Sequence, residues 1–149
     1  MIPPLQPDGT TLVLRRTFAA SRERVFRAWI EPEALESWFR LKGMRVRVRS
    51  LEARVGGCFR FEVENGYSIV GTYLHFVPPE KLVFTWRGAA TPGQETVVTL
   101  DFLDQGPATE LVLTHEGLNT PEMRALVGSG WPSLLDALAE ALSSPILGS

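Results

Sequence analysis

The stretch GSGWPSLLDALAEAL, residues 128–142, has the apolar spacing of an amphipathic helix, yet it begins with two glycines and carries a proline near its start. Its apolar side chains recur every three or four residues, which places them on one face of a helix. Pro132 lacks a backbone donor and crowds the carbonyl of Gly128, so the sequence predicts a kink or a restart near Trp131. The alternative is two separate helices, with Pro132 in the first turn of the second.

The helical pattern extends upstream of this stretch. Thr120 is suited to the N-cap, and Pro121 is suited to the first helical position, where a missing N–H has no partner to lose. The apolar face then comprises Met123, Leu126, Val127, Trp131, Leu134, Leu135, Leu138 and Leu142. This is the longest helix that the sequence predicts.

Short strand-like runs precede this helix and are separated by glycine and proline. They cover residues 11–18, 44–50, 59–64, 67–77, 81–88, 95–104 and 109–117. Alternation of apolar and polar residues, or enrichment in β-branched and aromatic ones, is typical of strands. Asn65-Gly66 predicts a type I′ hairpin turn, and Pro78-Pro79 ends the strand before it.

Two short helices are expected between the first two strands. Ser21 can cap one over a segment whose apolar residues have helical spacing, and Pro32 can begin the other. The order of elements predicts the α+β class. An antiparallel meander would form one sheet, and the long helix would pack on one of its faces.

Length, charge and cysteine content limit the kinds of protein that this chain can be, namely its number of domains, its partners and its compartment. A chain of 149 residues with 44% hydrophobic residues can bury the core of a single domain, which we assign to residues 11–149 after an extended lead-in over residues 1–10. The lead-in has neither the pattern of a signal peptide nor that of a membrane anchor. A net charge of −2 gives no global attraction for nucleic acid or anionic membranes. Cys58 cannot form an internal disulfide and only two histidines are present, so we expect a cytoplasmic protein with no metal or other cofactor.

Few residues point to chemistry. No motif for a nucleophilic hydrolase is present, and Gly56-Gly57 is interpreted as a hairpin turn, not as a phosphate-binding loop. His115 has the same strand parity as Leu111 and Leu113, so it should face the apolar side of the sheet near a strand end. Two interpretations stay open for this histidine: a group satisfied by nearby backbone, or a polar contact to a bound ligand.

A basic row is predicted on the outer face of residues 44–50, where Arg45, Arg47 and Arg49 alternate with apolar residues. Such a row could contact an anionic partner. Three acidic residues lie on or near the adjoining run, namely Glu52, Glu62 and Glu64. Because these can pair with the arginines across the sheet, a solvated face of mixed charge is the favoured interpretation.

Together these motifs resemble the SRPBCC superfamily of START, Bet v 1 and polyketide-cyclase-like proteins, in particular its branch related to the C-terminal domain of the activator of Hsp90 ATPase. The stretches that carry the resemblance are RTFAASRERVFRAWIEPEALESWF (16–39), RVGGCFRFE (54–62), GTYLHFVPPEKLVFTW (71–86), TELVLTHEGL (109–118) and GWPSLLDALAEAL (130–142). Each is weak alone, but their combination is specific and spans nearly the whole chain.

The resemblance implies a helix-grip fold, in which a curved antiparallel sheet wraps around the long C-terminal helix and encloses a cavity roofed in part by the two short helices. We expect the cavity to be lined by Trp38, Phe39, Phe61, Tyr73, Trp86, Leu113, His115, Met123, Val127, Trp131 and Leu135. Relatives often carry a polar residue, commonly histidine, one turn before the late tryptophan. Val127 stands at that position here, so a role of that residue in ligand binding or catalysis is not expected in this chain.

Three classes of function remain. The leading hypothesis is a non-enzymatic binder of a small hydrophobic molecule, oriented by polar groups such as His115 and Tyr73. The second is a cyclase-like or hydrolase-like enzyme, for which His115, Tyr73 and Asp101 are the candidate acids or bases. The third is a stress-related or chaperone-associated interaction domain. For it, 149 residues leave no room for the larger N-terminal domain of the eukaryotic cochaperone, and self-association as a homodimer has no particular residue in its support.

Overall fold

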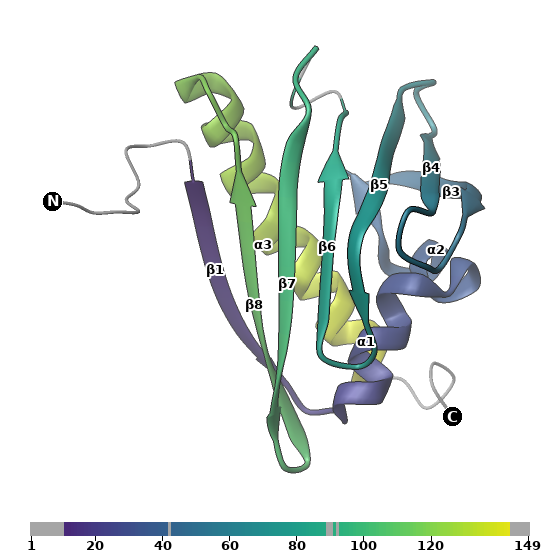
Figure 1. Ribbon diagram of the computed structural model, residues 1–149, viewed down its shortest axis with the longest axis vertical. Coiled ribbons are helices and arrows are strands. Elements are labelled where there is room, and N and C mark those ends of the chain that lie inside the picture. The colour runs from purple at the N-terminus through teal and green to yellow at the C-terminus, as the bar shows by residue number, and fades with distance from the viewer. Residues whose placement is uncertain (1–10, 42, 89–90, 92, 144–149) are drawn as a thin grey trace, which may run out of the picture.

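The computed structural model describes residues 11–41, 43–88, 91 and 93–143, which form one curved antiparallel sheet with three helices on its inner side (Figure 1). The elements in chain order are β1 (Thr11–Phe18), α1 (Arg22–Ile30), α2 (Pro32–Trp38), β2 (Arg40–Leu41), β3 (Met44–Leu51), β4 (Cys58–Val63), β5 (Ser68–Val77), β6 (Lys81–Trp86), β7 (Thr96–Gln105), β8 (Ala108–Glu116) and α3 (Pro121–Ser143). The strand order is β1-β8-β7-β6-β5-β4-β3-β2. The predicted helix-grip α+β fold is therefore confirmed. The expected lead-in over residues 1–10 lies outside the described residues.

The helices begin where the sequence predicts. The side chain of Ser21 accepts a hydrogen bond from the backbone N–H of Arg24 at 3.3 Å, which caps α1. Pro32 occupies the first turn of α2. At α3, the hydroxyl of Thr120 accepts from the N–H of Met123 at 3.1 Å. Ser21 and Thr120 accept a hydrogen bond from a backbone N–H that has no partner within the helix, and Pro32 has no such N–H to satisfy.

The long helix α3 runs without a break from Pro121 to Ser143, with Pro132 inside it. A restart at Trp131, and the alternative of two separate helices, are therefore wrong, whereas the kink near Trp131 stays a prediction. Pro132 lies on the exposed side of α3, whereas Trp131 and Leu135 are buried. Packing of the buried side holds the helix together, while the ring of Pro132 faces solvent.

Two turns differ from the sequence prediction. The N–H of Gly66 donates to the carbonyl of Val63, so Asn65 and Gly66 are the third and fourth residues of the β4–β5 turn, not the central pair of a type I′ turn. Gly66 has a φ of 97°, which suits the bulge position that follows a type I turn. The strand β2 was not predicted, because its two residues pair only with Met44 and Arg45 and carry no pattern of their own.

The strand β5 lies in the curved sheet between β4 and β6, and its pairing with β6 is irregular. Ser68–Thr72 pairs with β4 and Tyr73–Val77 pairs with β6, while an isolated bridge joins Val70 to Arg87 just after β6. Gly71 lies between the Val70–Arg87 bridge and the Tyr73–Phe84 pair, where a Cβ would overlap the carbonyl oxygen of Thr85 and the ring of Phe59. The absence of a side chain at this residue therefore permits the close approach that curves the sheet.

The hydrophobic core fills the space between the inner face of the sheet and the helices. Alternate residues of β7 and β8 point inward, and Leu100, Leu111 and Leu113 have no exposed surface. Aromatic side chains from α1 and α2 complete it, with the rings of Trp29 and Trp38 4.9 Å apart. The core is continuous under β1 and β4–β8, and it leaves one region beside the middle of α3 unfilled.

Candidate functional site

A pocket of about 500 Å³ lies between α3 and the part of the sheet formed by β3–β6. Its apolar wall comprises Met44, Val63, Tyr67, Ile69, Trp86, Leu126, Val127, Trp131, Leu134 and Ala137. Arg40, Asn65, Ser129 and Ser133 add polar groups, and Gly43, His115 and Gly130 complete the lining. A volume in this range with a mainly apolar wall and a few polar groups is typical of sites for small molecules. We call it the apolar pocket.

The helix side of this pocket explains the glycine-rich start of the stretch at residues 128–142. Leu126, Gly130, Ser133 and Ala137 all line the pocket, and their spacing of four, three and four residues places them on one stripe of α3. Three of the four are small. A Cβ at Gly130 would meet nothing within 4 Å, whereas one at Gly128 would lie 3.9 Å from Leu12. Gly130 therefore leaves pocket volume open, and Gly128 packs against β1.

His115 closes the inner end of the pocket and is fully buried. The indole N–H of Trp131, which can only donate, is 3.0 Å from its Nδ1. The hydroxyl of Thr96 donates to the carbonyl of Trp86 at 2.8 Å, so it accepts from the Nε2–H of His115 at 2.7 Å. Burial lowers the pKa of His115 from 6.5 to about 4. The imidazole is thus neutral, carries its proton on Nε2, and has both nitrogens satisfied, by side chains and not by the backbone group that the sequence suggested.

The three residues considered for acid–base catalysis do not share a site. Tyr73 is buried among aromatic rings, with Phe76 at 5.2 Å and Phe59 at 5.5 Å, and burial raises its pKa. It does not line the apolar pocket. Asp101 lies on the outer face of the sheet, on the other side from His115, and pairs with Lys81 at 3.6 Å. No proton-transfer pair is therefore formed by these residues.

The structure places four of the eleven expected cavity residues in the wall of the apolar pocket: Trp86, His115, Val127 and Trp131. The other seven are buried in the core and do not line it, namely Trp38, Phe39, Phe61, Tyr73, Leu113, Met123 and Leu135. Sequence reasoning missed Met44, Val63, Tyr67, Ile69 and the small residues of α3. Only Gly130 carried a signal, because a glycine inside an amphipathic helix needs a reason.

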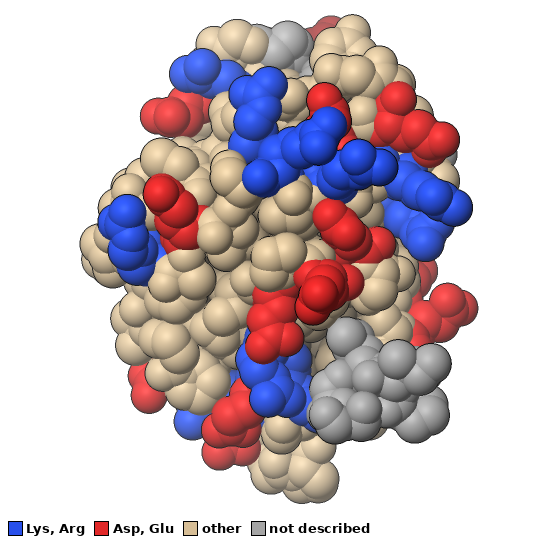
Figure 2. Space-filling view, turned by 90° about the vertical axis from the view of Figure 1, so that its right-hand side faces the viewer, with Lys and Arg blue, Asp and Glu red and all other residues tan. Residues whose placement is uncertain are grey.

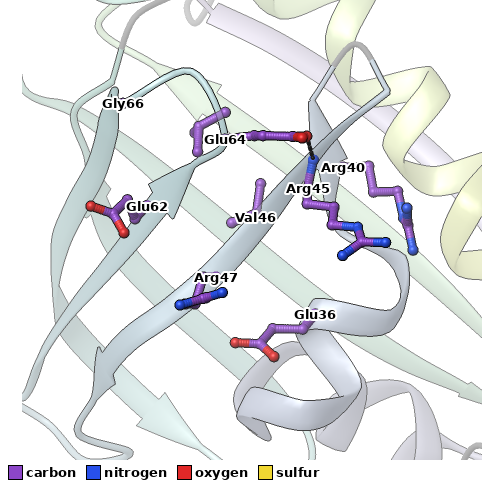
Figure 3. Close-up of a pocket in the computed structure, with 9 residues that line it drawn as sticks. Glu36, Arg40, Arg45, Val46, Arg47, Glu62, Glu64 and Gly66 are labelled. Carbon is purple, nitrogen blue, oxygen red and sulfur yellow. Dashed lines mark hydrogen bonds between the residues drawn. The ribbon is translucent and has the colours of Figure 1, made fainter.

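A second, charged pocket of about 630 Å³ adjoins the apolar pocket and is lined by residues of α2, β2, β3 and β4 together with the β4–β5 turn (Figure 3). Its charged residues are Glu36, Arg40, Arg45, Arg47, Glu62 and Glu64. Arg40 and Val63 line both pockets. Figure 2 views the side of the molecule that carries β3 and α2, and shows a band of Lys and Arg across its upper part with Asp and Glu beside it, and smaller separate basic groups elsewhere. We call this the charged pocket.

The expected pairing of the basic row with acidic residues holds for one arginine only. Arg49 forms an ion pair with Glu62 at 2.8 Å. Glu64 accepts from the backbone N–H of Arg45, not from its guanidinium, and Glu52 pairs with Arg54. Within the described residues, the guanidinium groups of Arg45 and Arg47 make no ion pair.

Two other kinds of site are absent from the part of the chain that the structure describes. No group of three or more His, Cys, Asp or Glu side chains is arranged to hold a metal ion. No helix in that part is long and apolar enough to span a bilayer.

A family model, described as activator of Hsp90 ATPase homolog 1-like protein, matches residues 19–143. The chain belongs to this family. The resemblance carried by the sequence motifs is thereby confirmed. Among curated family members, the human activator of 90 kDa heat shock protein ATPase homolog 1 is 29% identical over 112 residues, which cover 74% of this chain and 30% of the human protein. The chain thus spans about a third of the length of that relative.

Two solved structures have the same fold as this chain and match it over nearly their whole length. A crystal structure of a protein from Chromobacterium violaceum is 28% identical, with a TM-score of 0.78 over 91% of this chain and 99% of that one. The AHSA1 protein of Silicibacter pomeroyi is 27% identical, with a TM-score of 0.74 over 89% and 97%. Each match therefore covers about nine-tenths of this chain and nearly the whole of the other protein.

Proposed function

We propose that this protein binds a small, largely apolar molecule in the apolar pocket, between α3 and β3–β6, without transforming it. The observation that carries the proposal is the stripe of small residues on α3, which keeps about 500 Å³ open beside a mainly apolar wall. The buried side chains of Trp86, Val127 and Trp131 form its inner wall, while Tyr67 and Leu126 are exposed at its mouth, so a small molecule can enter from solvent and cover apolar surface. The rings of Trp86 and Trp131, 5.3 Å apart, give it a rigid aromatic floor.

The polar groups of the site support binding better than catalysis. His115 donates and accepts within the protein and is neutral at physiological pH, so it offers no free proton acceptor to a ligand. Tyr73 and Asp101 lie elsewhere, as described above. Because the buried polar groups of the pocket already have hydrogen-bond partners in the protein, an apolar ligand can bind there without leaving any of them unpaired.

Native mass spectrometry of freshly purified protein tests the proposal. We expect a reproducible mass above that of the denatured chain, from a retained small molecule. The variant Gly130→Leu should abolish this excess, because its side chain enters the open pocket, and it should not unfold α3, since leucine is the better helix former. The matched control Gly128→Ala adds a methyl group that contacts Leu12 outside the pocket and should retain the ligand.

One combination of results would contradict the proposal. If no excess mass is seen and the neutral dye Nile red shows no saturable binding to the wild-type protein, the pocket does not serve as a ligand site. Equal dye binding by Gly130→Leu and the wild type would have the same meaning.

A chaperone-associated role is the second candidate, and the sequence match to the human and mouse activators of 90 kDa heat shock protein ATPase favours it. In this role the chain would bind the chaperone as a protein partner. Calorimetric titration with purified Hsp90, followed by its ATPase rate, tests the idea. Saturable binding that Gly130→Leu leaves intact would establish a protein surface separate from the apolar pocket.

A further inference from the structure

We infer that the ligand of the apolar pocket is an amphipathic anion, whose apolar body fills that pocket and whose carboxylate or phosphate group is held by Arg40 and Arg45 at the border of the charged pocket. This inference rests on the proposed function and adds the chemical class of the ligand. It is carried by three features of the β2–β3 hairpin and its surroundings.

The first feature is a pair of like charges. Arg40 of β2 and Arg45 of β3 are directly opposite each other in the antiparallel register, and both line the charged pocket (Figure 3). Cross-strand neighbours have Cβ atoms about 5 Å apart, and like charges at that separation destabilise the pair of strands. An anion bound between the two guanidinium groups would remove this repulsion and gain charge-assisted hydrogen bonds.

The second feature is that the nearby carboxylates are engaged elsewhere. Glu36 accepts from the backbone N–H of Val48 at 2.8 Å, and Glu64 accepts from the backbone N–H of Arg45 at 3.0 Å. Glu62 is held by Arg49. Within the described ranges, the guanidinium groups of Arg40 and Arg45 have no ion-pair partner. The acidic residues therefore do not neutralise these two arginines directly.

The third feature is the place of Arg40 between the two pockets. Among the described residues it is the one residue with a permanent charge that lines the apolar pocket, and it also lines the charged pocket. A molecule in the apolar pocket therefore meets a single charged side chain, at the border with the charged pocket. An extended polyanion is disfavoured, because Glu36, Glu62 and Glu64 interrupt the basic band and the chain as a whole has a net charge of −2.

Three probes with the same ten-carbon chain test the inference: decanoate, decyl phosphate and the neutral 1-decanol. Binding is followed by tryptophan emission, since Trp86 and Trp131 line the apolar pocket. We expect at least one anion to bind about tenfold more tightly than 1-decanol, the ratio typical of one charge-assisted hydrogen bond. The tighter of the two anions identifies the head group as carboxylate or phosphate.

Variants separate the head-group site from a general effect of charge. Arg40→Gln and Arg45→Gln should each lower the affinity for the preferred anion about tenfold and leave that for 1-decanol unchanged. Arg60→Gln is the matched control, because it removes one exposed arginine of the neighbouring β4 that lines neither pocket. It should change none of the three affinities by more than about twofold, as expected for a screened surface charge.

Two results would overturn the inference. The first would leave the proposed function intact, and the second would contradict it as well. Equal affinity for 1-decanol and both anions, or equal effects of Arg40→Gln and Arg60→Gln, would exclude an anionic head group and leave the proposed apolar ligand standing. Absence of saturable binding for all three probes would count against the proposed function together with this inference.

Discussion

His115 is a buried histidine whose protonation state is determined by its two hydrogen-bond partners. Strand alternation placed it correctly on the apolar side with Leu111 and Leu113, and both of those residues are buried. Its partners could not be predicted, because Thr96 lies 19 residues away and Trp131 lies 16 residues away, on elements whose packing the sequence does not specify. The same holds for Arg40, whose position between two pockets depends on a two-residue strand.

The neutral state of His115 predicts a specific loss of stability in acid. Its pKa is lowered to about 4 in the folded protein, against 6.5 in the unfolded chain, so the unfolded state binds the additional proton between these values. The free energy of unfolding should therefore fall as the pH decreases from about 6.5 to 4, by roughly 3 kcal/mol from this residue alone. Urea unfolding at a series of pH values measures it.

Two variants isolate this contribution from that of the carboxylates. His115→Gln can still accept from Trp131 and donate to Thr96, but cannot titrate, so its unfolding free energy should decrease less between pH 7 and pH 4 than that of the wild type. His75→Gln changes the other, exposed histidine and should follow the wild type. Parallel pH curves for His115→Gln and the wild type would show that His115 is not responsible.

At the scale of elements, the sequence predicted helix starts correctly where a single residue caps the first backbone N–H groups or needs no hydrogen bond there. Ser21, Pro32 and Thr120 fixed three helix starts, and all three were confirmed. The signals failed where tertiary packing competes with local preference. Pro132 should end an isolated helix, but α3 continues through it because the buried apolar side on either side of Pro132 outweighs the lost hydrogen bond.

Pro132 therefore costs stability, and replacing it should raise the free energy of unfolding. Pro132→Ala restores a backbone donor for the carbonyl of Gly128 and removes the crowding ring on the exposed side of α3. We expect a gain of roughly 2 kcal/mol, after allowance for the greater freedom of the unfolded chain. Chemical denaturation measures the gain. Pro121→Ala, at the tolerant first turn, serves as the control and should change stability by less than about 0.5 kcal/mol. No gain for Pro132→Ala would mean that the proline fits α3 without cost.

At the scale of the whole molecule, the sequence predicted an antiparallel sheet with one long helix on it, and the sheet order follows the meander apart from β1. It could not predict where the open volume lies. That volume depends on how sharply the sheet bends at β5 and on how α3 crosses it, and both are properties of packing between distant residues. For this reason only four of the eleven expected cavity residues line the apolar pocket, and the other seven are buried in the core.

The bend of the sheet predicts that Gly71 tolerates no side chain. In Gly71→Ala the new methyl group would overlap the backbone carbonyl of Thr85, which cannot move without separating β5 from β6. We expect a loss of about 3 kcal/mol or more in the free energy of unfolding, or failure to accumulate as folded protein. Thermal and urea unfolding measure the loss. Gly130→Ala adds the same group in open space and should be neutral or stabilising. Wild-type stability in Gly71→Ala would show that the bend does not need a glycine.

The pairing of β1 with β8 has a consequence for how the protein forms during synthesis. Thr11 lies opposite Glu116 and Phe18 opposite Thr109, so β1 cannot form its hydrogen bonds until β8, about 100 residues later in the chain, has been synthesised. Contacts of such high sequence separation form slowly. The helix that walls the pocket is made later still, at residues 121–143. A nascent chain therefore displays an unpaired strand and an uncovered apolar face until β8 and α3 have been synthesised, and during that interval it depends most on protection from aggregation.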